Sequence, residues 1–519
     1  MDSTGAATLL HLWGKTGGES GYHPALFHVL DVGNVARELL GPHASPRFRN
    51  VMACALGADD PDSLASWLPL IVAMHDIGKL SSPFQGMQHD AAQVKAQRAR
   101  LEAEGFRFGR LQGQKYAHQV VSAVFVRNSW PDLEPGLPPD FLSVVRDSIG
   151  GHHGTYAPPK EMGRVRKYCD SDEPPEWAEY RAAAYRLLRH MLAPRWDGVP
   201  DVPTPPHIRP ATMALTGFIV LCDWLGSDEH RFAATAPCDI DAYNERSRAR
   251  AREAVDAVGF SHNRALSLVI PFAELFPDIR EIRPLQRAID DMAPQSLTWP
   301  SLTIIEAPTG EGKTEAALCL ARRLAVTGPS DEIYFALPTT ATSNQMFLRV
   351  CALLDRVIGS ETSVKLVHGQ AYLVEDDLLL QLLGDVDEEA RTRAEAWFAP
   401  SKRALLAPFG VGTVDQVELT ALNARYYMLR LFGLAGKVVI IDEVHAYDTY
   451  MSTILERSLR WLSALGSSVI LLSATLPSTR RAALARAFAE GFGGTVETRD
   501  GSPPYPCVST WSPSGSCRK

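Results

Sequence analysis

The sequence lacks the cysteine spacing of a zinc ribbon or a disulfide framework. Its eight cysteines are scattered over 519 residues, and no two of them form a C-x-x-C pair. Free, reduced thiols are the simplest interpretation, and they are typical of a cytoplasmic protein. We therefore expect a cytoplasmic location.

Long apolar runs are missing as well. No run approaches the roughly 20 residues that a helix needs to cross a bilayer. The N-terminus "MDSTGAATLLHLWGK" is acidic at once and has no long apolar core. Neither a signal peptide nor a membrane segment is expected.

The chain has no excess of basic charge. Its net charge of −8 argues against a basic nucleic-acid coat, but it leaves room for a local basic channel. Hydrophobic residues make up 45% and charged residues 22%, as in ordinary soluble globular proteins. A prior of about 150 residues per domain predicts two to four domains.

The pattern up to about residue 265 is helical. "HPALFHVLDVGNVARELLG" places Pro24 in the first turn of a helix and Gly41 at its end. "SLASWLPLIVAMHDIGKL", "QVVSAVFVRNSW" and "ATMALTGFIVLCDWLGS" indicate further buried helices. A proline-rich stretch at 194–210 could by itself pass for a domain linker.

From about residue 300 the pattern changes. The short apolar runs "SLTIIEAP", "DEIYFALP", "KVVIIDE" and "SSVILLSAT" alternate with helical segments. Fully apolar strands that alternate with helices indicate a parallel sheet covered on both faces. The predicted organisation is an all-α domain over 1–265, an α/β domain over 266–505, and a tail or truncated linker over 506–519.

Histidines and aspartates recur inside or beside the apolar helices of the first domain. A lone aspartate in the run "FIVLCDWLGS" would be costly to bury without a cation or hydrogen-bond donors. In "SIGGHHGTY", two glycines let the backbone turn and point both rings inward. The candidate metal ligands are His28, His75, Asp76, His118, His152, His153 and Asp223.

Each of these residues has a plainer interpretation. A single histidine is more often a satisfied core or capping residue than a ligand. A second His-Asp pair, His89 and Asp90, lies in the polar stretch "GMQHDAAQ", so the dipeptide alone proves nothing. The joint pattern is a stronger signal than any of its parts.

Taken in order, "HDIGK", "GGHH" and "CDWLGS" resemble the HD phosphohydrolase superfamily. The extension "HDIGKLSSPFQ" more narrowly resembles the nuclease domain of the CRISPR-associated helicase–nuclease of Type I interference systems. This resemblance implies that the seven residues bind two metal ions, with Asp76 bridging them. Lys79 would contact the scissile phosphate or be a solvated lysine. Ser227 would donate to phosphate or cap a helix. Because Asp223 follows the proline-rich stretch, that stretch belongs inside the nuclease domain.

The ligand types limit the choice of metal. Imidazole suits Fe, Mn, Ni or Zn, and carboxylate adds affinity for Mn or Mg. Two ions about 3.5–4 Å apart can hold an attacking hydroxide and stabilise the leaving oxygen of a phosphodiester. The expected cofactors are two divalent ions drawn from Fe, Mn, Ni or Mg.

A phosphate-binding loop opens the second half of the chain. "EAPTGEGKTEAAL" follows a predicted strand and meets the P-loop pattern except at Ala307, where superfamily 2 helicases commonly have alanine. Backbone amides would hold the phosphates at a helix N-terminus, Lys313 would reach the β- and γ-phosphates, and Thr314 would bind Mg²⁺. The loop residues are Thr309, Gly310, Glu311, Gly312, Lys313 and Thr314.

Two later motifs complete a nucleotide site. In "VVIIDEVHAYD", Asp442 would hold Mg²⁺ and Glu443 would polarise the attacking water. "LLSATLP" places Ser473 and Thr475 where such helicases couple ATP to nucleic acid, and "IRPLQ" offers Gln286 to read adenine. ATP with Mg²⁺ is the expected cofactor, and a decayed nucleotide lobe is the alternative.

Other segments resemble the same CRISPR helicase–nuclease family, including "ALPTTATSNQMF", "LVHGQA" and "GVGTVDQ". The resemblance implies a path for single-stranded DNA lined by Thr339, Thr340, Asn344, His368, Thr413 and Gln416.

A basic stretch lies in the first domain. From Lys95 to Lys115 it holds six basic residues against two glutamates and could face DNA, although a solvated face is the commoner explanation.

Helicases of this superfamily need two RecA-like lobes, and this chain ends shortly after the SAT motif. A truncated gene, a frameshift or a split protein would each account for that. The expectation is an incomplete helicase that binds ATP–Mg²⁺ weakly and hydrolyses it poorly, because the arginine of a second lobe is lacking.

The expected fold is an all-α HD domain followed by one α/β RecA-like lobe with a mainly parallel sheet. The expected function is metal-dependent nicking and degradation of single-stranded target DNA in CRISPR defence, recruited by the RNA-guided surveillance complex Cascade. Asp76, Lys79 and Glu443 are the candidate catalytic residues. The alternatives are a metal phosphohydrolase acting on nucleotides, or an idle remnant that binds DNA or Cascade.

Overall fold

The computed structural model separates the chain into two compact units. The first contains residues 1–44 and 56–256, and the second contains residues 45–55 and 257–519. The structure describes residues 3–17, 21–87, 91–110, 116–201, 208–261, 269–293, 296–338, 404–422, 424–496, 505–513 and 515–518.

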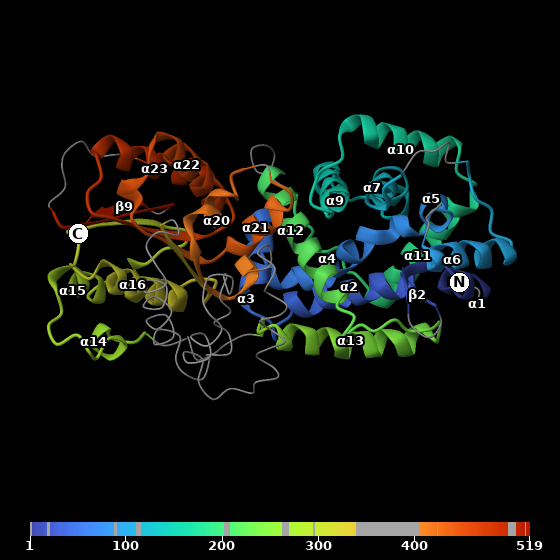
Figure 1. Cartoon of the computed structure of the whole chain (residues 1–519), viewed down its shortest axis with the longest axis horizontal. Helices are drawn as coiled ribbons and strands as arrows, with labels where there is room; N and C mark the ends of the chain where they lie inside the picture. The colour runs from blue at the N-terminus through green and yellow to red at the C-terminus, as the bar shows by residue number, and fades with distance from the viewer. Residues whose placement is uncertain are drawn as a thin grey trace. The chain divides into compact units, whose positions relative to one another are not determined.

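The first unit is built from helices, as predicted (Figure 1). Helix α2 starts directly after Pro24, which was predicted to lie in its first turn, and ends at Leu40, directly before the predicted stop at Gly41. In the described residues no helix is long and apolar enough to span a membrane. The elements are α1 (Ser3–Leu10), β1 (Trp13–Thr16), β2 (Tyr22–Pro24), α2 (Ala25–Leu40), η1 (Pro61–Ser63), α4 (Leu64–Ala73), η2 (Met74–Lys79), α5 (Ser82–Gln85), α6 (Ala92–Ala103), α7 (His118–Asn128), α8 (Trp130–Leu133), α9 (Pro139–Gly151), α10 (Pro159–Ser171), α11 (Glu176–Leu192), α12 (Ile208–Gly226) and α13 (Ile240–Ala257).

The second unit contains a sheet whose described strands follow the order β5-β4-β6-β7-β3-β8-β9. The neighbouring pairs from β5 to β3 are parallel, which confirms the predicted mainly parallel sheet. The strands are β3 (Leu302–Glu306), β4 (Ile333–Leu337), β5 (Phe409–Thr413), β6 (Val438–Ile441), β7 (Ser468–Ser473), β8 (Cys507–Ser512) and β9 (Gly515–Arg518).

Helices cover both faces of this sheet (Figure 1). Ile305 and Phe335 point to the face covered by α15 and α16, whereas Ile304 and Tyr334 point to the face covered by α22 and α23. Burial of both faces explains why the strand sequences are continuously apolar rather than alternating. The helices of this unit are α3 (Pro46–Leu56), α14 (Phe272–Leu275), α15 (Pro284–Asp290), α16 (Lys313–Thr327), η7 (Ala404–Leu406), α20 (Val414–Glu418), α21 (Tyr427–Leu434), η8 (Val444–Ala446), α22 (Thr449–Ala464) and α23 (Ser478–Gly491).

The division into units differs from the predicted boundary at residue 265. It falls at residue 256, and α3 belongs to the second unit although it lies early in the chain. The reason is Arg47, which is fully buried and donates hydrogen bonds to the carbonyls of Ala435, Phe432 and Gly433. Its guanidinium also lies 3.3 Å from the carboxylate of Glu332.

The prediction that residues 506–519 form a tail or linker is wrong. Strand β8 pairs antiparallel with all five residues of β3, and β9 pairs with β8. Val508 and Trp511 are buried in the two cores beside the sheet. The proline-rich approach suggested a linker, whereas the alternating run "CVSTWS" extends the sheet.

Candidate metal centre and nucleotide cavity

The His-Asp pair lies where one helix type gives way to another. Helix α4 ends at Ala73, and the chain continues as the 3₁₀ segment η2, with Asp76 in a non-helical conformation (φ −111°, ψ 16°). Gly78 then allows a close approach to α7, because a Cβ there would lie 2.1 Å from the carbonyl oxygen of His118. This contact brings the His-Asp pair next to the helix that begins with His118.

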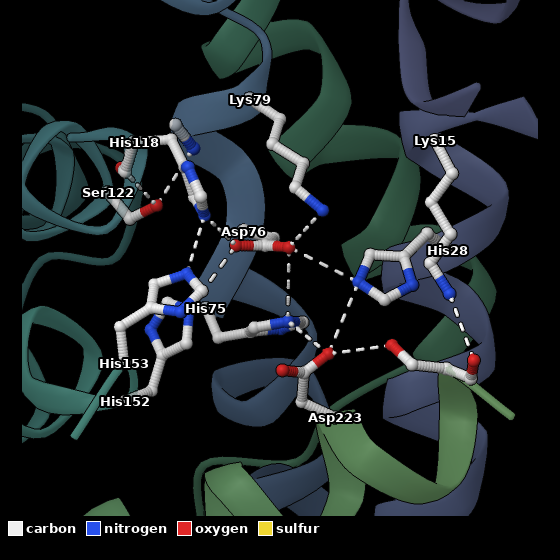
Figure 2. A network of polar contacts seen from close by, with 12 residues as sticks. Lys15, His28, His75, Asp76, Lys79, His118, Ser122, His152, His153 and Asp223 are labelled. Atoms are coloured by element: carbon white, nitrogen blue, oxygen red, sulfur yellow. Dashed lines mark hydrogen bonds and ion pairs between the residues drawn. The ribbon is translucent and has the colours of Figure 1, made fainter. Parts of the chain in front are cut away.

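All seven predicted ligands meet at this point (Figure 2). They come from α2, η2, α7, α12 and the end of α9, and their ligand atoms form two groups. Within each group these atoms lie within 4.8 Å of one another. One group is Asp76, His118, His152 and His153, and the other is His28, His75 and Asp223.

Asp76 connects the two groups through its two carboxylate oxygens. Oδ1 lies 3.2 Å from His118 Nε2 and 3.4 Å from His152 Nε2. Oδ2 lies 3.2 Å from His28 Nε2 and 3.4 Å from His75 Nε2. One oxygen therefore faces each group, which is the arrangement that a carboxylate bridging two ions requires.

Hydrogen bonds to the backbone orient two of the rings. His75 Nδ1 donates to the Val72 carbonyl at 2.9 Å, and His152 Nδ1 donates to the Ile149 carbonyl at 2.6 Å. Each bond turns Nε2 toward the centre, as the outer partners of metal-binding histidines do. His152 Nε2 is buried without a hydrogen bond in the described part of the chain, so a cation would satisfy it.

Burial keeps several of the imidazoles neutral. It lowers the pKa of His28 to about 3, helped by the charge of Lys79. It also lowers the pKa of His153 to about 3, helped by His152 and His118. Burial likewise lowers the pKa of His118. Neutral rings keep a lone pair for a metal at neutral pH.

The carboxylates and His75 form a coupled group of charges. Burial raises the pKa of Asp76, but the charges of Lys79 and His75 outweigh it and hold that pKa well below its usual range. At Asp223 the contact with His75 outweighs burial in the same way and lowers the pKa. Burial lowers the pKa of His75, but both carboxylates together raise it to about 9. Without metal, His75 is therefore protonated on both ring nitrogens at neutral pH. A metal ion that binds Nε2 would have to displace the proton there.

Two lysines border the centre. Lys79 Nζ lies 2.7 Å from Asp76 Oδ2, so its ammonium faces the Asp76 carboxylate rather than bulk solvent. Lys15, on β1, donates to the Ser227 carbonyl at 3.3 Å, and Ser227 Oγ donates to Asp223 at 3.0 Å. Burial lowers the pKa of Lys15, with the charge of Lys79 adding to the effect. Sequence reasoning missed Lys15, because "LWGKT" carries no metal-ligand pattern.

Asp31, on α2, is fully buried. Its Oδ2 accepts a hydrogen bond from Tyr243 at 2.8 Å and lies 3.7 Å from His23 Nε2. Asp31 follows His28 by almost one helical turn, so this group supports the stretch of α2 that holds a ligand. It is not a surface charge.

The predicted nucleotide residues meet in the second unit. The P-loop connects β3 to α16, with Gly310 and Gly312 at positive φ (85° and 71°), where glycine is favoured. A cavity of about 400 Å³ lies over this loop. Its lining includes Gln286, Thr309, Gly310, Gly312, Lys313, Thr314, Asp442 and Glu443.

Several side chains of the cavity hold one another in place. Lys313 Nζ donates to the carbonyls of Ala307 at 2.8 Å and Pro308 at 3.2 Å. Gln286 accepts from the Arg283 backbone at 3.1 Å and donates to the Gly312 carbonyl at 3.4 Å. The Glu311 side chain does not line the cavity, and its carboxylate lies 3.4 Å from Arg283.

The DEVH and SAT motifs contact each other directly. Asp442 accepts a hydrogen bond from the Glu443 backbone at 2.8 Å, and Glu443 adopts a left-handed conformation (φ 55°). His445 lies 3.0 Å from the Glu443 carboxylate and accepts a hydrogen bond from the Ala474 backbone at 3.1 Å. His445 therefore connects Glu443 of the DEVH motif to Ala474 of the SAT motif. Within the SAT motif, Ser473 donates a hydrogen bond to the Thr475 carbonyl.

The expected single-strand path is described only in part. Thr413 precedes α20, and Gln416 accepts a hydrogen bond from Arg430. His89 and Asp90 lie outside the described residues, as do Thr339, Thr340, Asn344 and His368.

The basic stretch predicted to face DNA is largely neutralised by acidic partners. Arg98 pairs with Glu102 and Arg100 with Glu104, both at 2.9 Å. Arg107 pairs with Glu176 at 3.0 Å. The described part of this stretch, up to residue 110, therefore gives little support to a DNA-binding face.

Comparison with known proteins accounts for both units. The family described as "Cas3, HD domain" matches residues 13–232, and that described as "DEAD/DEAH box helicase" matches residues 287–483. The CRISPR-associated endonuclease/helicase Cas3 of Thermus thermophilus is 36% identical over 507 residues, which cover 96% of this chain and 52% of the relative.

Solved structures give the same picture. A crystal structure of T. fusca Cas3 with AMPPNP matches with a TM-score of 0.80 and 30% identity, covering 98% of this chain and 56% of that chain. A structure described as a CRISPR RNA-guided surveillance complex, pre-nicking, contains a chain that matches with a TM-score of 0.70 and 28% identity, covering 98% of this chain and 53% of that one.

This chain spans about half the length of the curated relatives that it matches. Both family matches lie on the units that hold the two candidate sites. The chain belongs to the Cas3 family of CRISPR-associated nuclease–helicases, and it carries the HD domain and a DEAD/DEAH box helicase domain.

Proposed function

We propose that this chain is a metal-dependent single-stranded DNA nuclease joined to an ATP-binding helicase lobe, acting in CRISPR defence. The observation that supports this best is the Asp76 carboxylate, which turns one oxygen to each of two ligand groups. The ligand set of five histidines and two aspartates suits Fe, Mn or Ni, with Mg as a further candidate.

In the proposed site, His28, His75 and Asp223 would hold one cation and His118, His152 and His153 would hold another, with Asp76 shared. Bound divalent cations lower the pKa of coordinated water and offset negative charge on phosphate oxygens. Lys79, whose ammonium lies beside Asp76, would bind the scissile phosphate. The buried rings and the backbone bonds of His75 and His152 hold this geometry before substrate arrives.

In the second unit, the P-loop amides and Lys313 would bind the phosphates of ATP. Thr314 and Asp442 would hold Mg²⁺, Glu443 would orient the attacking water, and Gln286 would face adenine. The cavity that these side chains share supports the assignment. So does the solved relative with AMPPNP.

The proposed partner is Cascade, because a similar chain belongs to an RNA-guided surveillance complex before nicking. Guide pairing would then choose the target sequence, and little base-specific readout is expected from this chain. The main alternative, a metal phosphohydrolase acting on nucleotides, would not explain why the chain carries a helicase lobe.

The test is nicking of circular single-stranded DNA by the full chain with Mn²⁺, Ni²⁺, Fe²⁺ or Mg²⁺. Asp76→Ala should lower the rate at least about 1,000-fold, because it removes the carboxylate shared by both groups. Asp241→Ala, a change at an exposed aspartate of α13, is the matched control and should leave the rate unaltered.

Cleavage that persists in Asp76→Ala would remove the metal-centre assignment. Phosphate release from mononucleotides without DNA nicking would favour the nucleotide phosphohydrolase. Absence of both activities across the metal series, in a folded chain, would favour the idle remnant.

A further inference from the structure

A second cavity, of about 740 Å³, lies in the first unit beside the loop that holds His152 and His153. Four helices contribute to it, α7, α9, α10 and α12, together with the start of the segment that follows His153. Its size falls within the range of about 300–1,000 Å³ that is usual for ligand sites. The charged residues in its lining are Arg127, Arg146, Arg166, Arg209 and Asp147.

The positive charge of this cavity is mostly uncompensated. Arg146 lies 2.7 Å from Asp147 and is paired. Within the described part of the chain, Arg127, Arg166 and Arg209 have no carboxylate at ion-pair distance, and all three are exposed. Three guanidinium groups from three different helices therefore converge on one hollow without an acidic partner.

The cavity also has an apolar floor that is held in place. The ring of Tyr156 packs on Gly151, where a Cβ would lie only 2.5 Å from the ring. Its hydroxyl lies 2.9 Å from Thr216 Oγ1, and Met162 and Met213 complete the surface. Such a floor can accept a sugar or a base without selecting its identity.

The cavity and the metal centre share one loop. Gly150 lines the cavity two residues before His152, and Tyr156 lines it three residues after His153. A single strand of DNA bound in the cavity would therefore pass close to the predicted metal ligands. We propose that this cavity binds backbone phosphates of single-stranded DNA next to the metal centre, independent of sequence; this rests on the proposed nuclease function.

Guanidinium groups suit this role better than other cations would. Arginine pairs with phosphate through two parallel hydrogen bonds and remains charged at all working pH values. Each phosphate neutralised on a single strand contributes about 0.7 to the slope of log affinity against log salt. The number of engaged arginines can thus be read from a salt titration.

The test is the affinity of the full chain for fluorescent oligothymidine, measured by anisotropy in EDTA so that no cleavage occurs. The double variant Arg127→Glu/Arg166→Glu should weaken binding about tenfold at low salt and reduce the salt slope by about 1.4. Lys167→Glu, an exposed change on the same helix α10 outside the cavity, is the matched control and should alter affinity less than twofold.

If Lys167→Glu weakened oligothymidine binding as much as the double variant does, the effect would come from general surface charge and the proposal would be overturned. Unaltered binding in the double variant would also overturn it. If dTMP bound in the micromolar range and the double variant lost dTMP but kept the oligonucleotide, the cavity would be a free-nucleotide site instead. Because binding is read without metal, a chain that binds through these arginines but never cleaves would fail only the nuclease proposal.

Discussion

The two candidate sites are assembled in opposite ways. The nucleotide cavity draws most of its residues from short contiguous motifs, and the P-loop between β3 and α16 supplies five of the residues in its lining. The candidate metal centre draws its seven predicted ligands from five separate parts of the first unit. One site is mostly local in sequence, and the other exists only once the helices have packed.

The two sites also differ in their surroundings. Asp76, His28, His75 and His152 are buried, and their charges are balanced by one another and by Lys79. The P-loop backbone around Thr309 and Gly310 is exposed. Burial strengthens the electrostatic interactions within the candidate metal centre, whereas the exposed loop is accessible to a ligand. The comparison predicts that changes at one site should leave the other unaffected.

The largest expected effect concerns the unit that holds the nucleotide cavity. Arg47→Met should destabilise the second unit by about 3–5 kcal/mol, because it leaves the buried carbonyls of Ala435, Phe432 and Gly433 without their donor and removes one of the two cations beside Glu332. Calorimetric unfolding of the full chain should show one transition moved and the other unaltered. Arg37→Met, which removes a bond to the Leu192 carbonyl in the first unit, is the reciprocal control. Joint movement of both transitions by Arg47→Met would show that the units unfold together.

The next effect separates the two chemistries. Lys313→Ala should weaken ATP binding about 100-fold, since it removes the charge that meets the β- and γ-phosphates. Metal-dependent nicking without ATP should stay within twofold of the parent. Arg457→Ala, a change at an exposed residue of α22 outside the cavity lining, is the control for ATP binding. Loss of nicking in Lys313→Ala would contradict the independence of the sites.

The pH dependence of metal affinity tests the coupled charges. Because His75 has a pKa of about 9 without metal, an ion must displace its proton at neutral pH. Affinity for Mn²⁺ should therefore rise by about tenfold per pH unit between 6.5 and 8.5, with close to one proton released. Calorimetry in two buffers of different ionisation enthalpy measures this release. His190→Ala, at an exposed histidine of α11, should not alter it, and no proton release would contradict the charge assignment.

The smallest effect concerns Lys15. Lys15→Ala should raise the KM for single-stranded DNA about fivefold and leave kcat and metal content within twofold, because this ammonium borders the Asp223 side of the centre without being a ligand. Lys15→Arg should restore most of the affinity. Steady-state nicking and metal analysis provide the readouts, with Lys167→Ala as the control. A fall in bound metal would make Lys15 a structural support of the centre instead.

Most of the fold could be predicted from the sequence because its signals are local. Pro24 and Gly41 bound α2 as the pattern indicates, and the four apolar runs became β3, β4, β6 and β7. Long-range contacts decided the exceptions. Nothing near Arg47 in the sequence indicates that α3 joins the second unit, and nothing before β8 indicates that it pairs with β3.

The predicted metal ligands also depend on contacts between residues that lie far apart in the sequence. The motifs and the resemblance predicted all seven ligands, whereas only the packed helices show that their side chains lie together. The split of seven ligands into two groups around Asp76 depends on the kink after α4 and on the close approach that Gly78 permits. Lys15 escaped notice because its only signal is spatial.

Basic charge gives the clearest contrast. The run from Lys95 to Lys115 looked like a DNA-facing stretch, but Arg98, Arg100 and Arg107 are paired with glutamates. Four arginines far apart in the sequence line one hollow beside the metal ligands instead. Local periodicity and motif spacing by themselves determined the two-part fold class and the nucleotide loop. Only tertiary packing decided which charges are neutralised and which converge, because those outcomes depend on distances between residues that the chain order keeps apart.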